Sequence, residues 1–287
     1  MNPFDFITQT LRIAVPYLFA ASGGLVAERA GIVSLTLEGF MLSGAFTATL
    51  GSYYSGSPVI GVLAGAAGGL AFGLLHGIAT VRFRADHVVS GIAVNLFVIG
   101  LTQVILMLLF DSSSNSPRVE GFQAGLSGFG DPLVWMGLAS VPLVAFLLYK
   151  TPFGLRVQAA GEHPEAAASV GINVRFIRYV SVAISGVLAG LGGVYLALDQ
   201  HQFTNNMTAG RGFIAIAAVI FGRWDPWRAG AACLLFAAAE TLQIQLQGVG
   251  GIPSQFIQII PYALTIVALA GLVGRAVAPA ALGRAEE

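Results

Sequence analysis

The stretch His87-Val-Val-Ser-Gly-Ile-Ala-Val-Asn-Leu-Phe-Val-Ile-Gly-Leu-Thr-Gln-Val-Ile-Leu-Met-Leu-Leu-Phe110 decides the fold class, because its 24 residues contain no Asp, Glu, Lys or Arg. A helix rises about 1.5 Å per residue, so roughly 20 mostly apolar residues cross the hydrocarbon core of a bilayer. The stretch is therefore predicted to be a membrane-spanning helix.

The composition extends this prediction to the whole chain. Of its 287 residues, 56% are hydrophobic and 10% are charged, and the mean hydropathy is +0.79. Soluble domains carry about 25% charged residues, and disordered chains need high charge with low hydrophobicity, so both classes are excluded. The net charge of +0 gives no basic excess for nucleic acid, and one cysteine, Cys233, cannot build a disulfide framework.

Apolar runs recur along the chain and predict an all-α polytopic membrane protein with about 8–10 transmembrane helices. The run at 211–222 is too short to cross a bilayer alone and is predicted to be a broken or half helix. No hydrophilic stretch is long enough to fold alone, so residues 1–287 are predicted to form a single transmembrane domain. The predicted spans are 11–27, 31–51, 58–80, 87–110, 131–149, 175–198, 211–222, 228–247 and 255–274.

The cations are distributed unevenly between the two ends of these spans. Lys and Arg concentrate in the cytoplasmic loops of membrane proteins. With an odd number of crossings, eleven of the 14 cations fall on one face and three on the other, which predicts an outside amino terminus and a cytoplasmic carboxyl terminus. The eleven are Arg29, Arg82, Arg84, Lys150, Arg156, Arg175, Arg178, Arg223, Arg228, Arg275 and Arg284, and the three are Arg12, Arg118 and Arg211.

Glu38 is an acidic residue in an apolar, glycine-rich stretch. A charged side chain near mid-membrane costs about 2.5–3.5 kcal/mol on insertion scales, so Glu38 must face protein or a water-filled cavity. Two interpretations stay open. Glu38 either lines a solute pathway or is a structural carboxylate that caps a helix break or pairs with Arg29 or another helix.

Side-chain amides form the second polar group. Asn95 and Gln103 are eight residues apart in one span, a spacing that predicts roughly one helix face. Glu240, Gln243 and Gln247 form a similar stripe in a later span. Amides offer both a donor and an acceptor, so they can recognise a solute, but they also hold helices together. The later stripe can line a cavity or contact a second membrane subunit.

Asn205 and Asn206 precede the short segment at its predicted external end, where a gate would stand. With Glu38, Asn95, Gln103 and Gln243 they complete the predicted set of pathway residues.

Catalytic and cofactor chemistry have no support in the sequence. There is no Walker A sequence, no H-E-x-x-H and no G-x-S-x-G. No metal, cofactor or catalytic residue is expected, and an ATP-driven role would require a separate ATPase.

Residues 150–174 form the most polar connection between two spans. Pro164 suits the first turn of a helix, Glu165 favours the same end, and Gly171 suits its termination. The segment is predicted to carry a helix of about two turns on the cytoplasmic side, with a small-residue surface that could enter a groove on a partner.

Gly161-Glu-His-Pro-Glu-Ala-Ala-Ala-Ser-Val-Gly-Ile-Asn-Val174 resembles the coupling segment of ABC importer permeases in the branched-chain amino acid and simple-sugar group. The resemblance extends over residues 13–283 and is strongest to the smaller permease of nucleoside-type importers. It is carried also by Gly23–Ala45, Gly190–Leu198, Asn206–Pro226 and Gln243–Gly274.

The resemblance implies a permease subunit that imports a nucleoside or similar small polar solute across a bacterial or archaeal inner membrane by alternating access. It implies three partners: an ATPase with two nucleotide-binding halves, a second permease and an external substrate-binding lipoprotein. The ATPase would dock on 150–174 through Gly161, Glu162, Pro164, Glu165, Ala166, Ala167 and Gly171. The alternative is a secondary transporter that uses Glu38 or Glu240 as its proton site.

Overall fold

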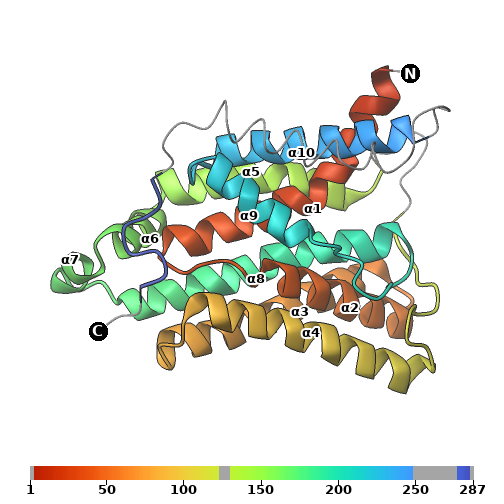
Figure 1. The fold of residues 1–287 in the computed structure, drawn as a ribbon, viewed down its shortest axis with the longest axis horizontal. Coiled ribbons are helices and arrows are strands. Elements are labelled where there is room, and N and C mark those ends of the chain that lie inside the picture. The colour runs from red at the N-terminus through yellow and green to blue at the C-terminus, as the bar shows by residue number, and fades with distance from the viewer. Residues whose placement is uncertain (1–2, 123–129, 248–276, 285–287) are drawn as a thin grey trace.

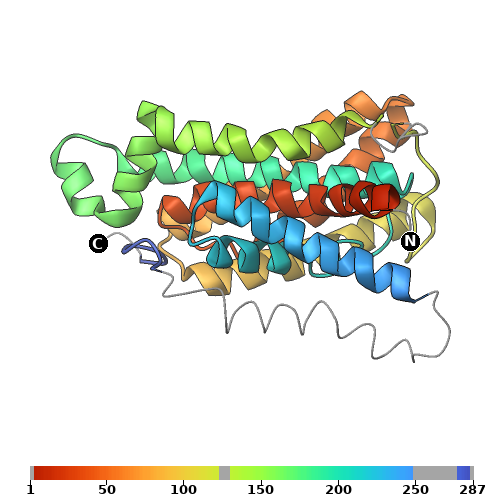
Figure 2. The same ribbon diagram turned by 90° about the horizontal axis from the view of Figure 1, so that it is seen from above.

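The computed structural model describes residues 3–122, 130–247 and 277–284, and its regular structure over these residues is helical apart from one isolated bridge between Asn115 and Thr204. The long helices lie side by side in a bundle (Figures 1 and 2). They are α1 (Pro3–Arg29), α2 (Leu37–Ser55), α3 (Pro58–Gly77, continued by the π-helix Ile78–Arg82), α4 (His87–Phe110), α5 (Pro132–Lys150), α8 (Val174–Asp199) and α10 (Pro226–Leu246). The short helices are α6 (Pro152–Glu162), α7 (Pro164–Ser169) and α9 (Arg211–Phe221).

Six of these helices are long and apolar enough to cross a membrane: α1, α3, α4, α5, α8 and α10. The half helix predicted at 211–222 is α9, with 11 residues. The predicted span 31–51 is displaced, because a turn occupies the residues before Leu37. The predicted span 255–274 lies outside the described residues.

Helix α2 is not among the six, and its position explains why. It packs against α3 and α8, and most of its residues are buried within the bundle. A helix surrounded by protein does not need an apolar surface on every side, so α2 carries Ser, Thr and Gly where α4 carries Leu and Val.

Glycines bring α2, α3 and α8 into backbone contact. A Cβ atom added at Gly44 would lie 2.3 Å from the carbonyl oxygen of Gly190, and one added at Gly69 would lie 2.1 Å from that of Gly186. Neither position has room for a side chain. Small residues at helix interfaces allow membrane helices to approach one another this closely.

The two ends of the bundle differ in charge. The end that carries α6, α7 and the segment 277–284 is called here the coupling end, and the opposite end the N-terminal end (Figure 1). The described members of the predicted basic group lie near helix ends or connections at the coupling end; Arg275 is outside the described residues. Arg211 departs from the prediction, because α9 begins within the bundle rather than at its N-terminal end.

Candidate functional site

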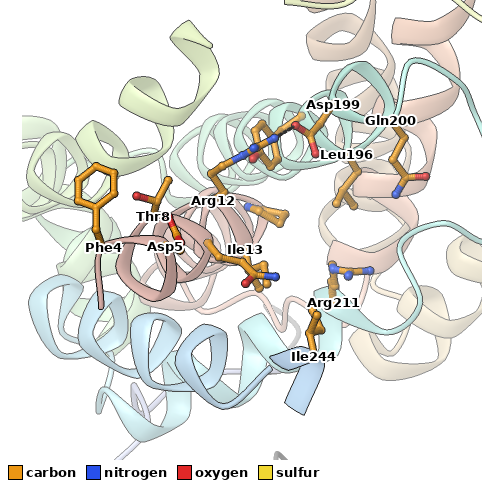
Figure 3. Close-up of a pocket in the computed structure, with 13 residues that line it drawn as sticks. Phe4, Asp5, Thr8, Arg12, Ile13, Leu196, Asp199, Gln200, Arg211 and Ile244 are labelled. Atoms are coloured by element: carbon orange, nitrogen blue, oxygen red, sulfur yellow. Dashed lines mark hydrogen bonds and ion pairs between the residues drawn. The ribbon is translucent and has the colours of Figure 1, made fainter. Parts of the chain in front are cut away.

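A cavity of about 640 Å³ lies in the N-terminal half of the bundle, between α1, α8, α9 and α10 (Figure 3). This volume is within the range of about 300–1,000 Å³ that is usual for small-molecule sites. Its polar lining includes two arginines, two aspartates, two glutamines and a tyrosine: Arg12, Arg211, Asp5, Asp199, Gln9, Gln200 and Tyr195. Phe4, Ile13, Pro16, Leu196 and Ile244 supply apolar walls.

The charges of the cavity are balanced. Arg12 on α1 forms an ion pair with Asp199 at the end of α8, and about one third of each side chain is exposed. The lining contains as many aspartates as arginines. A cavity with balanced charge favours a neutral solute that has both hydrogen-bond donors and acceptors over a strongly charged one.

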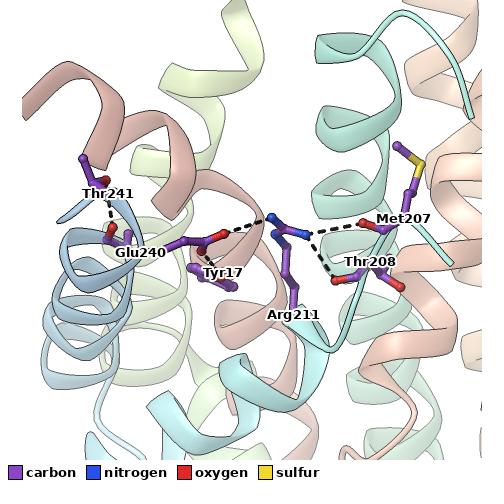
Figure 4. Close-up of polar contacts among 7 residues, drawn as sticks. Tyr17, Met207, Thr208, Arg211, Glu240 and Thr241 are labelled. Carbon is purple, nitrogen blue, oxygen red and sulfur yellow. Dashed lines mark hydrogen bonds and ion pairs between the residues drawn. The ribbon is translucent and has the colours of Figure 1, made fainter. Parts of the chain in front are cut away.

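Arg211, which lines the cavity, belongs to a polar network on three helices (Figure 4). Arg211 at the start of α9 donates from Nη2 to Oε1 of Glu240 on α10 at 3.1 Å. Tyr17, near the middle of α1, donates its hydroxyl to Oε2 of the same carboxylate at 2.5 Å. Glu240 therefore binds both Arg211, which lines the cavity, and the hydroxyl of Tyr17, which lies outside the lining.

Glu38 fixes the beginning of the half helix. Its two carboxylate oxygens accept hydrogen bonds from the backbone N–H groups of Gly210 (2.8 Å) and Gly212 (2.7 Å), and the residue is 5% exposed. The first N–H groups of a helix have no partner within the helix and carry partial positive charge. The carboxylate satisfies two of these groups and thereby sets the position of Arg211 between them. Of the two interpretations left open by the sequence, the described contacts favour the cap.

Asn95 also binds backbone. Its Oδ1 accepts from the N–H of Gly39 and its Nδ2 donates to the carbonyl of Leu35, both at 2.8 Å. The side chain therefore holds the turn that leads into α2. Gln103 is exposed on α4, so the prediction that the two amides share one face is wrong. Eight residues turn a helix by about 80° more than two full turns, which is enough to separate a buried position from an exposed one.

The remaining predicted pathway residues do not line the cavity. Asn205 donates its N–H to the carbonyl of Ser114, and its Oδ1 is buried with no hydrogen-bond partner among the described residues. Asn206 is exposed with a left-handed φ of 55°. Gln243 is half-buried on α10, three residues from Glu240. Sequence reasoning missed the cavity residues Arg12, Asp199 and Arg211. Their charge inside or beside apolar runs is the signal that could have found them.

The predicted coupling segment contains two helices, α6 and α7, which meet at His163. Helix α7 begins at Pro164 as predicted, and Gly171 follows it with a φ of 85°. Glu165, Ala166 and Gly171 are exposed, while Ala167 and Gly161 are buried.

Gly161 packs directly on the end of α1. A Cβ atom added there would lie 2.1 Å from the carbonyl oxygen of Arg29. The exposed surface of the segment is therefore available to bind a partner, whereas its buried surface packs against the bundle.

Comparison with known proteins identifies the family. The family model for the branched-chain amino acid transport system permease component matches residues 6–269. The chain is 39% identical to the guanosine ABC transporter permease protein NupQ of Bacillus subtilis, over 96% of this chain and 94% of that one. It is 37% identical to the nucleoside ABC transporter permease protein NupC of Lactococcus lactis, over 99% and 97%.

A solved structure shares the fold. A metal-chelate type ABC transporter in an inward-facing conformation superposes with a TM-score of 0.56 at 14% identity, over 92% of this chain and 84% of that chain. The matched family model and the near full-length relatives lead to one conclusion. The chain belongs to the family of branched-chain amino acid transport system permease components and is a membrane-spanning permease subunit of an ABC importer.

Proposed function

We propose that this permease subunit carries nucleosides, and that the solute passes through the cavity lined by Arg12 and Arg211. As the permease component of an ABC transporter it is a multi-pass membrane protein that works with an ATPase and a binding protein. This membership replaces the alternative of a proton-coupled secondary transporter. Glu38 and Glu240, the proton sites of that alternative, are both engaged in defined hydrogen bonds.

The charge balance of the cavity is the observation that carries the choice of solute. A nucleoside is neutral, and its base and ribose offer donors and acceptors to guanidinium, carboxylate and amide groups. The two relatives named for guanosine and nucleoside transport support the same class of solute. A nucleotide would bring phosphate charge into a cavity whose arginines already have carboxylate partners.

Within the complex, we assign the coupling end to the cytoplasm and the N-terminal end to the outside. The concentration of arginines at the coupling end supports this orientation. The ATPase, with two nucleotide-binding halves, would then dock on the exposed side of α6 and α7. A second permease would complete a heterodimer, and an external lipoprotein would deliver the solute at the N-terminal end.

Uptake by the complete complex in proteoliposomes tests the proposal. We expect ATP-dependent uptake of radiolabelled guanosine that is inhibited by other nucleosides and not by guanosine monophosphate or glucose. Uptake that persists without ATP and collapses with a proton gradient would refute the importer mechanism. Efficient competition by glucose with none by nucleosides would refute the assignment of the solute.

The variant Arg211→Gln tests the cavity itself. It removes one of the two arginines that line the cavity, and we expect it to weaken guanosine uptake. The matched control is Arg118→Gln, which removes an exposed arginine outside the cavity lining. Equal uptake by the two variants would contradict the route through the cavity.

A further inference from the structure

The C-terminal segment Pro279–Gly283, named here the C-terminal strap, joins two parts of the coupling end. The N–H of Ala281 donates to the carbonyl of Gly161 at the end of α6 (2.9 Å), and the N–H of Gly283 donates to the carbonyl of Gly31 between α1 and α2 (2.9 Å). The N–H of Ala280 donates to the carboxylate of Glu162 (3.2 Å). Three contacts along the strap thus connect the coupling segment to the turn that precedes α2.

Arg178 lies beneath this junction. It is 2% exposed on α8; its Nε donates to the carbonyl of Ala30 at 3.2 Å and its Nη1 to the carbonyl of Arg284 at 3.3 Å. Guanidinium presents several donors in a fixed plane, which allows one side chain to hold two separate backbone segments. Arg178 therefore binds both the turn after α1 and the residue that follows the strap to the same helix.

The turn bound by Arg178 is connected to the cavity through Glu38. Seven residues beyond Gly31, Glu38 caps the start of α9 through Gly210 and Gly212. The residue between these two glycines is Arg211, which lines the cavity. Hydrogen bonds therefore join α6 and the strap to Gly31, the chain leads from Gly31 to Glu38, and hydrogen bonds join Glu38 to the residues on either side of Arg211.

We propose that Arg178 is a positioning residue for transport. With the C-terminal strap it locks the coupling segment to the turn between α1 and α2, so that movement of α6 and α7 reaches α9. This inference rests on the proposed docking of the ATPase on α6 and α7. It predicts that loosening the junction separates ATP hydrolysis from transport, because the ATPase still binds but its movement no longer reaches the cavity.

The experiment compares two test variants of the permease with two matched controls, in the complete complex in proteoliposomes. Arg178→Gln removes the guanidinium, and truncation after residue 276 removes the strap while leaving Arg178 in place. The matched controls are Arg175→Gln, an exposed arginine one turn earlier on α8, and truncation after Arg284, which keeps the strap. Guanosine uptake and ATP hydrolysis are measured on the same assembled complexes.

We expect Arg178→Gln and the longer truncation to lower uptake per ATP hydrolysed by about 10-fold, while the controls stay at the wild-type ratio. Arg178→Lys should recover part of the ratio, because an ammonium keeps the charge but not the planar donors. If Arg178→Gln fails to assemble, the truncation alone decides. An unchanged ratio, or a proportional loss of uptake and hydrolysis, would overturn the positioning role.

A further variant separates this inference from the proposed function. Ala166→Trp places a large side chain on the exposed side of α7. If it leaves ATPase assembly, hydrolysis and uptake unchanged, the docking on α7 is wrong and the inference falls with it. If it blocks assembly while the truncation keeps the wild-type ratio, docking stands and only the role of Arg178 and the strap is refuted.

Discussion

Replacing Glu38 by Gln should destabilise the permease, because it weakens the hydrogen bonds that hold the start of the half helix α9. The carboxylate accepts hydrogen bonds from two backbone N–H groups at 2.8 and 2.7 Å in a buried position. A glutamine has one acceptor oxygen, so it can keep one of these bonds, and its NH₂ group then faces the other N–H. The change removes charge from a site where two donors converge, without altering the size of the side chain.

The size of the effect follows from these contacts. A hydrogen bond to a charged group contributes about 1.5–3 kcal/mol, and a neutral one about 0.5–1.5 kcal/mol. One bond is lost and the other weakened, while a neutral amide is less costly to bury than a carboxylate. We expect the free energy of unfolding to fall by about 2 kcal/mol. For a chain of this size that corresponds to a melting temperature lower by roughly 4–8 °C.

The single cysteine provides the assay. Cys233 is fully buried, so a thiol-reactive fluorescent dye labels it only when the surrounding helices open. Labelling during a temperature ramp in detergent then reports the melting of wild type, Glu38→Gln and the exposed control Glu120→Gln. Faster hydrogen exchange at Gly210 and Gly212 would locate the change at the start of α9.

A melting temperature for Glu38→Gln within about 1 °C of wild type would refute the cap as a stabilising contact. The same conclusion would follow if Glu120→Gln melted as early as Glu38→Gln. Loss of transport with an unchanged melting temperature would instead support the interpretation that Glu38 lines the solute pathway.

Three further predictions concern the network, the packing and the turn before α2. Arg211→Gln and Glu240→Gln should each reduce guanosine uptake, and the double variant should lose less than the two single losses combined; additive losses would contradict the pairing. Gly44→Ala should lower the free energy of unfolding by at least ~2 kcal/mol in the same dye assay, because its Cβ would lie 2.3 Å from the carbonyl oxygen of Gly190. The control Gly100→Ala, which has open space around the added Cβ, should be neutral or slightly stabilising. Asn95→Leu should lower the melting temperature by several degrees, since it removes the side-chain partner of the Gly39 N–H and of the Leu35 carbonyl. Melting at the wild-type temperature would show that water replaces the lost contacts.

The sequence predicted the lipid-facing part of the fold better than the buried part. Helix α4 has an unbroken apolar run and its predicted bounds equal the observed ones. Helix α2 begins six residues later than predicted, because Asn95 holds a non-helical turn that hydropathy cannot distinguish from helix. Pro164 located α7 correctly, but the sequence analysis did not predict that the residues before it form a second helix, α6.

The cavity could not be predicted from the sequence, for a different reason. Arg211 and Glu240 are 29 residues apart, and Arg12 and Asp199 are 187 apart. Only the folded bundle places each pair in contact. Amide content pointed instead to residues such as Gln103, because composition does not say which face of a helix is covered by a neighbour.

The position of Arg211 within the bundle also constrains how the chain is built into the membrane during synthesis. A charged side chain at mid-membrane costs about 2.5–3.5 kcal/mol until it finds a partner, and α9 has only 11 residues with which to offset that cost. The carboxylate of Glu240 emerges from the ribosome 29 residues after Arg211. We therefore expect α9 to stay at the translocation channel until α10 has been synthesised, and the two helices to enter the lipid together as a hairpin.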